Sequence, residues 1–180
     1  MTNKVAYQGE PGAFGEMACI ATLPGWQPVA HESFEKVADA VAAGLVQRGM
    51  VPVENSNAGL VPGALEMLER KAVRILSRHP LPVAIHCLGL PGAKLSDIRL
   101  VRSHPMAIRE CRRFTSQHGL ASEDSRNTAI AAHRLAEMGD PTIAVLASSR
   151  SAEIYGLDIL AANIHDCADN TTFFAMIAPA

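Results

Sequence analysis

Short apolar segments alternate with amphipathic segments along most of this chain, and most of them end at Gly, Pro or a polar cluster. Apolar runs of about four to eight residues suit buried strands, whereas apolar residues spaced three and four apart suit helices. We predict strands at residues 4–9, 48–55, 79–92, 98–105, 142–149 and 171–177. We predict helices at residues 13–23, 32–46, 62–72, 106–119, 127–140 and 150–160, the last with a break at its glycine. This alternation predicts the α/β class, with parallel sheets covered by helices on both faces.

Two segments lack helices of their own on both sides, and they indicate two lobes within one domain that spans residues 1–180. These segments, at about 79–90 and 171–178, are candidates for an antiparallel pair of strands at a hinge. Lobe 1 then covers about residues 1–78 with a possible return of the C-terminal strand, and lobe 2 covers about 79–168. Polar loops follow the apolar strands, and open α/β sheets bind ligands at such carboxyl ends.

The composition fits this class, because 48% of the residues are hydrophobic and only 4% are aromatic. Such a mixture suits helices packed on strands better than an aromatic-rich sandwich. The formal net charge of -2 gives no electrostatic footprint for nucleic acid or an anionic membrane surface. No apolar run approaches the ~20 residues that span a bilayer, and the chain begins without an apolar signal core. We therefore expect a cytoplasmic protein with no nucleic-acid or membrane partner.

The four cysteines, Cys19, Cys87, Cys111 and Cys167, are scattered singly and form no C-x-x-C pair. In a reducing compartment this pattern favours buried free thiols over disulfides or catalysis. His165 and Cys167 form the only close His–Cys combination, and two ligands are a weak zinc signal. We expect no metal site.

Polar stretches stand at five junctions between predicted strands and helices. Each has a structural explanation, since their glycines suit turns and their Ser, Thr and Asn residues suit helix caps. Together with Ser33 at the start of the helix at 32–46, the predicted caps are Ser56 or Asn57, Ser103, and Asn127 or Thr128. The backbone N–H groups at helix starts also bind anions, so a cleft that gathers several of them would suit a small dicarboxylate. Whether these loops converge is left open by the sequence. The five stretches are residues 9–15, 53–59, 102–107, 125–129 and 169–173.

Six segments resemble the catalytic domain of prephenate dehydratase, in the same order and over essentially the whole chain. They are "VAYQGEPGAFGEMA", "VPVENSNAGLVPG", "RSHPMAIRECRRF", "NTAIAAH", "ASSRSAEIYGLDILAANIHD" and "NTTFFAMI". The resemblance implies a two-lobed α/β fold similar to type II periplasmic binding proteins, with the active site in the interlobe cleft. It also implies a homodimer and no organic cofactor or metal.

The same resemblance implies an activity, the conversion of prephenate to phenylpyruvate with loss of water and carbon dioxide. It implies catalytic roles for Thr172, Glu54 and Ser56, with Thr172 as the hydrogen-bond donor to the departing hydroxyl. Substrate-binding roles follow for eight further residues, namely Asn55, Ser103, His104, Thr128, Thr171, Phe173, Gly12 and Ala13.

One residue departs from the family pattern. The family motif is Thr-Arg-Phe, and this chain has Thr172-Phe173-Phe174 instead. A guanidinium forms bidentate bonds with a carboxylate that phenylalanine cannot replace, so the loss costs ~10- to 150-fold in binding or rate. Arg102 or Arg109 could supply a substitute anchor, although surface positions are the commoner role at such spacing. Since the chain ends at Ala180, we also expect no C-terminal ACT domain and no feedback by phenylalanine.

Three functions remain open at this point. The first is a prephenate dehydratase with an altered anchor. The second is a repurposed relative in specialised metabolism, acting on another cyclic acid by decarboxylation or elimination. The third is a non-catalytic module that binds a small acid.

Overall fold

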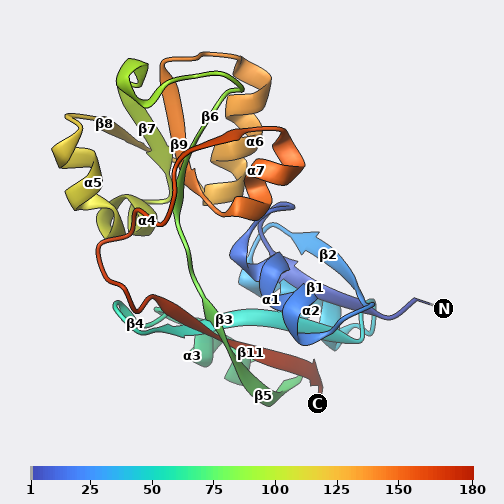
Figure 1. Cartoon of the computed structure of the whole chain (residues 1–180). Helices are drawn as coiled ribbons and strands as arrows, with labels where there is room; N and C mark the ends of the chain where they lie inside the picture. Colours follow the sequence, from blue (N-terminus) through green and yellow to red (C-terminus); the bar gives the residue numbers. More distant parts are fainter. Residues whose placement is uncertain (1) are drawn as a thin grey trace. The chain divides into compact units, whose positions relative to one another are not determined.

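The computed structural model describes residues 2–180 and divides them into two compact units (Figure 1). Unit 1 consists of the residues up to Glu10, Phe14–Val83 and Asp169–Ala180. Unit 2 consists of Pro11–Ala13 and Ala84–Ala168. The two-lobed organisation expected from the sequence is therefore present. The change of unit falls at residue 84, a few residues later than we expected, and the last strand returns to unit 1.

Unit 1 is built on a mixed sheet with the strand order β2-β1-β3-β11-β5, to which β4 adds by pairing with β3. Strand β1 runs parallel to β2 and β3, whereas β11 runs antiparallel to both β3 and β5. Figure 1 shows β3, β11 and β5 side by side. The elements are β1 Lys4–Gln8, α1 Phe14–Thr22, β2 Gln27–His31, α2 Phe34–Ala42, β3 Arg48–Asn55, β4 Gly59–Leu60, α3 Ala64–Glu69, β5 Val73–Pro82 and β11 Thr171–Pro179.

Unit 2 has its own sheet, with the order β10-β6-β9-β7-β8. Strands β7, β8 and β9 are parallel, while β6 is antiparallel to β9 and β10. The elements are β6 His86–Gly89, the 3-10 helix Leu95–Asp97, β7 Leu100–Ser103, α4 Pro105–Glu110, α5 Arg112–Gln117, β8 Ala121–Asp124, α6 Thr128–Met138, β9 Ile143–Ala147, α7 Ser149–Tyr155 and β10 Asp158–Ala161.

The prediction of parallel sheets was wrong, because each sheet contains antiparallel neighbours. The expected antiparallel pairing at the end of the chain does occur, with Thr171 opposite Pro82 and Phe174 opposite His79. However, the predicted strand at 79–92 is two strands. Its first part belongs to β5 of unit 1, and its later part forms β6 of unit 2.

Two predicted helices were also too long. The helix at 106–119 is interrupted at Cys111, whose backbone angles, φ -113° and ψ 23°, leave the helical region. The helix at 150–160 ends at Tyr155, because Gly156 adopts φ 65° in the left-handed region that glycine favours. The chain then continues into the short strand β10.

Helix α2 shows how unit 1 forms its core. Ser33 caps the helix as predicted, accepting a hydrogen bond from the Lys36 N–H at 3.3 Å. Val37 and Val41, one turn apart, are fully buried in a cluster that includes Ile177 of β11. Burying one such side chain contributes about 1.5–3 kcal/mol. Gly49 on β3 permits this close packing, because a Cβ there would lie 2.9 Å from both Ile177 and Val37.

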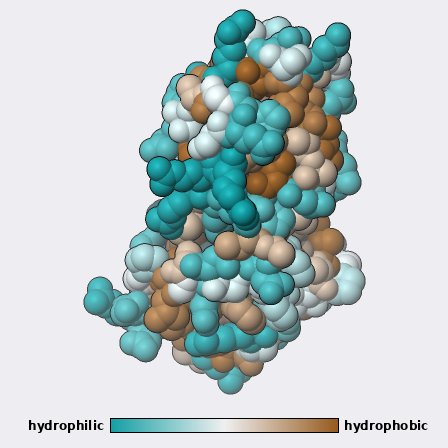
Figure 2. Space-filling model, turned by 60° about the vertical axis from the view of Figure 1, so that its left-hand side comes forward, coloured by the Kyte–Doolittle hydropathy of each residue, from teal (hydrophilic) through white to brown (hydrophobic). Residues whose placement is uncertain are grey.

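The molecular surface is mixed. Figure 2 shows hydrophilic and hydrophobic residues interspersed over one face of the molecule. No helix within residues 2–180 is both long and apolar enough to cross a membrane. The large hydrophobic side chains that remain exposed are spread over both units, at Ile20, Leu45, Leu60, Ile75, Leu76, Met138, Ile154 and Ile159.

Candidate functional site

The predicted site residues of unit 1 meet where β3 ends and β11 begins. The strand register places Thr172 opposite Asn55, and the Asn55 Nδ2 group donates to Thr172 Oγ1 at 3.1 Å and to Asn170 Oδ1 at 2.9 Å. The Asn55 Oδ1 atom accepts from the backbone N–H groups of Asn57 and Ala58 at 2.8 and 3.0 Å. Both hydrogens and both lone pairs of the Asn55 amide are therefore used within the protein. Asn55 orients its neighbours and has no hydrogen left for a ligand.

The Thr172 hydroxyl has a different hydrogen-bond balance. Its oxygen accepts from Asn55, and within residues 2–180 its hydrogen has no acceptor. A hydroxyl carries one hydrogen, and the bond from Asn55 occupies one of its two lone pairs. Thr172 is half-buried, so water reaches it only in part. The arrangement leaves Thr172 ready to donate to an oxygen of a bound molecule.

The Ser56 side chain forms hydrogen bonds with backbone groups at the start of β11. Its Oγ donates to the Asp169 carbonyl at 3.1 Å and accepts from the Thr171 N–H at 3.0 Å. The Ser56 N–H also donates to the Thr171 carbonyl at 2.8 Å. These bonds fasten the start of β11 to the end of β3. The suggestion that Ser56 or Asn57 caps a helix was wrong, because Gly63 occupies the N-cap position of the next helix.

Glu54 and Phe173 lie opposite each other on β3 and β11. The Glu54 carboxylate has no hydrogen-bond or ion-pair partner in the part of the chain that the structure describes, residues 2–180. Phe173 packs against the hydrophobic cluster of unit 1 that contains Ala175 and Ile177. The residue that replaces the arginine of the family motif thus extends the apolar core and supplies no positive charge.

In unit 2, Ser103 is the last residue of strand β7, and His104 follows it directly. The Ser103 hydroxyl is fully buried and donates to the Leu146 carbonyl at 2.6 Å, so it fixes β7 to β9. Ser103 does not cap the following helix as suggested. His104 does, because its Nδ1 accepts from the Met106 N–H at 3.1 Å. This bond requires the proton of a neutral imidazole to be on Nε2, which leaves Nε2 as a donor.

Packing around the ring lowers the pKa of His104, and the carboxylate of Asp124 partly offsets this. A lowered pKa favours the neutral ring, which the cap requires. Thr128 lies at the start of α6 and is buried, directly after Asn127, which caps the helix through a 2.7 Å bond to the Ile130 N–H. Of the two predicted caps, Asn127 and Thr128, Asn127 is the one that caps the helix.

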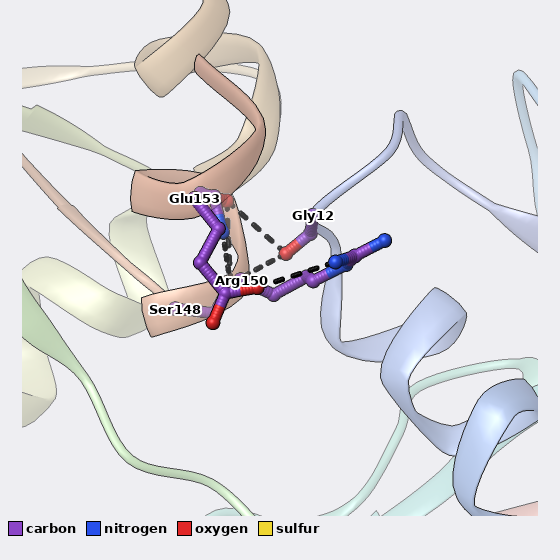
Figure 3. Close-up of polar contacts among 5 residues, drawn as sticks. Gly12, Ser148, Arg150 and Glu153 are labelled. Atoms are coloured by element: carbon purple, nitrogen blue, oxygen red, sulfur yellow. Dashed lines mark hydrogen bonds and ion pairs between the residues drawn. The ribbon is translucent and has the colours of Figure 1, made fainter. Parts of the chain in front are cut away.

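The loop Pro11–Ala13 belongs to unit 2, although its neighbours in sequence belong to unit 1. Figure 3 shows the Gly12 carbonyl directed at the start of helix α7. Ser148 Oγ donates to this carbonyl at 2.6 Å, and Ser151 Oγ donates to it at 3.1 Å. Both serines are fully buried. The Tyr155 hydroxyl adds a 2.7 Å bond to the Pro11 carbonyl. These contacts hold the loop that carries Gly12 and Ala13, two of the predicted binding residues.

Neither proposed substitute for the missing arginine is shown to act as an anchor. Arg102 is held by Glu123, with Nε 3.0 Å from one carboxylate oxygen and Nη2 3.1 Å from the other. Arg109 lines a groove of unit 2 that contains none of the predicted site residues. Among residues 2–180, no group of three His, Cys, Asp or Glu side chains is placed to hold a metal ion.

Comparison with known proteins identifies the family of this chain. The family model described as prephenate dehydratase matches residues 5–180. The chain belongs to the prephenate dehydratase family. Arogenate dehydratase/prephenate dehydratase 1 of Arabidopsis thaliana is 38% identical over 97% of the chain, which spans 45% of that protein. A bifunctional N-acyl-homoserine lactone acylase/prephenate dehydratase of Komagataeibacter europaeus is 36% identical over 94% of the chain, which spans 60% of that protein.

Solved structures agree with the family and with the fold. The prephenate dehydratase of Arthrobacter aurescens, solved with L-Phe, superposes with a TM-score of 0.90 at 26% identity, covering 98% of this chain and 60% of that one. A periplasmic substrate-binding protein of Coxiella burnetii superposes with a TM-score of 0.52 at 10% identity, covering 99% and 84% of the two chains. The family member described here therefore has the two-lobed fold that the sequence predicted.

The predicted site residues fall into two groups within the prephenate dehydratase domain. Unit 1 brings together Glu54, Asn55, Ser56, Thr171, Thr172 and Phe173 at one end of its sheet, and unit 2 contains Gly12, Ala13, Ser103, His104 and Thr128. That these groups face a common cleft stays a prediction. Sequence reasoning missed Ser148 and Ser151, because a serine at a helix start looks like an ordinary cap. Their complete burial was the informative signal, and it is visible only in the fold.

Proposed function

We propose that this domain converts prephenate to phenylpyruvate, as a carbon–oxygen lyase of phenylalanine biosynthesis. The bond from the ring carbon to its hydroxyl breaks, the electrons of the ring C–CO₂⁻ bond move into the ring, and one proton is taken up. Water and carbon dioxide leave, and the ring becomes aromatic. The proposal is supported by family membership and by 38% identity to a relative named for arogenate and prephenate dehydration.

The single observation that carries the mechanism is the hydrogen-bond state of Thr172. Its oxygen is already occupied by the Asn55 amide, which leaves its hydrogen for the substrate. A donor at the departing hydroxyl stabilises the negative charge that develops on that oxygen in the transition state. Aromatisation supplies much of the driving force, so positioning and one aimed donor meet most of the chemical demand.

The test uses purified protein with prephenate and, in parallel, with L-arogenate, in which an amino group replaces the keto group. Phenylpyruvate is followed by its absorbance in alkali, and phenylalanine by chromatography. We expect turnover of one of these substrates, and a lower KM in the Phe173→Arg variant, which restores a guanidinium. Absence of both products at high enzyme concentration would reject the proposal. Carbon dioxide without an aromatic product would indicate the repurposed decarboxylase, and tight binding without turnover would indicate a non-catalytic module.

A second candidate is hydrolysis of an N-acyl-homoserine lactone to a fatty acid and homoserine lactone. The relative from Komagataeibacter europaeus is named for this activity together with prephenate dehydration. The observation that favours it here is Phe173, since a neutral acyl amide needs no guanidinium and gains from an apolar neighbour. Mass spectrometry of the products from an N-acyl-homoserine lactone tests it, and intact substrate after long incubation would exclude it.

We further propose a cytoplasmic homodimer that needs no metal or organic cofactor. Family analogy supports the dimer and the absence of a cofactor, and the composition supports the location. Sedimentation equilibrium would give twice the chain mass of 19.1 kDa for the dimer. Unchanged turnover after dialysis against EDTA would support the absence of a metal requirement, and loss of turnover would oppose it.

A further inference from the structure

Unit 2 has a groove of about 420 Å³ between α4, α5 and the edge strand β8. This volume lies within the range of small-molecule sites, roughly 300–1,000 Å³. Two of its lining residues stand on either side of the helix break at Cys111, Arg109 at the end of α4 and Arg112 at the start of α5. Residues three apart share one face of a helix, and Arg109 and Arg112 border the same hollow across the break.

The side chains that line this groove carry a net positive charge. Arg109 and Arg112 pair with no carboxylate within residues 2–180. The arginines next to the groove behave differently, since Arg102 is paired with Glu123 and Arg113 with Asp166. Asp124 is the only acidic residue of the lining, so the groove has an excess of one positive charge. A guanidinium offers a planar fork that matches a carboxylate or a phosphate group.

The rest of the lining sets the shape of a ligand. Ile108 and Leu120 contribute apolar side chains to the lining, and the exposed residues Ser116 and Ser122 contribute side chains with hydroxyl groups. A fully polar ion such as inorganic phosphate would leave the apolar side chains unused. A neutral aromatic molecule would leave both arginines without an anionic partner.

We propose that this groove is a binding site for a small organic anion, with one carboxylate or phosphate group on a compact apolar body. The anionic group is held by Arg109 and Arg112, and the apolar body lies against Ile108 and Leu120. The site lies wholly in unit 2 and does not depend on the proposed dehydratase activity.

The test is a titration of the ¹⁵N-labelled full chain, followed by amide chemical shifts. The probes are benzoate, phenyl phosphate, inorganic phosphate and, as an uncharged match in shape, benzamide. We expect saturable shifts at Gly119 and Leu120 with benzoate or phenyl phosphate, and weaker responses to the other two probes. Benzoate alone would identify a carboxylate site and phenyl phosphate alone a phosphate site. Shifts at Asn55 and Thr172 report the candidate catalytic site separately.

The double variant Arg109→Gln/Arg112→Gln should weaken binding by about tenfold or more, since hydrogen bonds to charged groups are lost. Arg134→Gln is the matched control, because Arg134 is exposed on α6 outside the groove. All three positions are exposed, so these variants should fold. Equal responses to benzamide and benzoate, absence of saturation, or equal affinities of the double variant and the control would each overturn the proposal.

Discussion

Replacing Thr172 with valine removes one hydroxyl while keeping the branched shape of the side chain. In the folded protein this deletes the acceptor for one Asn55 Nδ2 hydrogen, a bond of 3.1 Å at a half-buried position. Such a bond contributes about 1 kcal/mol to folding. For a chain of this size that corresponds to a fall in Tm of roughly 2–4 °C. The stability effect is therefore modest.

The effect on turnover is predicted to be much larger. Removing one aimed donor from a developing oxyanion lowers kcat by about 10²- to 10³-fold, which corresponds to roughly 2.7–4 kcal/mol. We expect a loss of this size in the initial rate of aromatic product formation from prephenate, with a small change in KM. The binding of product, measured by calorimetry, should remain close to that of the unmodified protein.

Ser33→Ala provides a matched control. It removes the N-cap of α2, and loss of such a cap costs about 1 kcal/mol, close to the cost of Thr172→Val. Both variants should therefore have similar Tm values, and only Thr172→Val should lose turnover. If both variants lose turnover in proportion to their Tm, the Thr172 hydroxyl has only a structural role and the reasoning is refuted.

Four further predictions concern single residues. Phe173→Arg should lower the free energy of unfolding by roughly 1–2 kcal/mol in urea titrations, because a half-buried ring leaves the apolar cluster; unchanged stability would contradict that packing. Gly12→Ala should cost about 1–3 kcal/mol and weaken substrate binding, because φ is +92° and a Cβ would lie 2.5 Å from a buried serine oxygen. Burial and the nearby His165 lower the pKa of His86. The contribution of the neutral ring to stability is therefore present above pH ~6.5 and is lost as the pH falls. The variant His86→Asn keeps an acceptor for the Asn163 N–H and should make the Tm less sensitive to acid in melting curves. Only Cys167 is exposed, so a disulfide reagent should label one thiol in the native protein and four after unfolding, and two or more native equivalents would contradict the structure.

The fold could be predicted where buried positions form a continuous apolar run in the sequence. The strand at 48–55 was placed correctly because its apolar run is bounded by polar residues on both sides. Strand β8 was missed because all four of its residues are exposed, so no apolar alternation indicates it. The local sequence pattern also could not predict whether neighbouring strands run parallel or antiparallel, because β11 pairs with β3 across more than a hundred residues of sequence.

The candidate site was predictable for a different reason. Polar residues at the ends of buried strands indicate a site edge, and the family resemblance assigned roles to Asn55 and Thr172. Their hydrogen bond could not be predicted, because it depends on the register between two distant strands. The same holds for Arg102, whose partner Glu123 lies on a strand that the sequence did not reveal.

The role of Thr172 is tested most directly by a proton NMR time course of prephenate with the unmodified protein and with Thr172→Val at equal concentration. With the unmodified protein, we expect the vinyl signals of the ring to decay and the aromatic signals of phenylpyruvate to grow, and we expect the variant to be about 10²-fold slower or more. Persistent vinyl signals with the unmodified protein, or equal rates for both proteins, would contradict the role of Thr172 as donor.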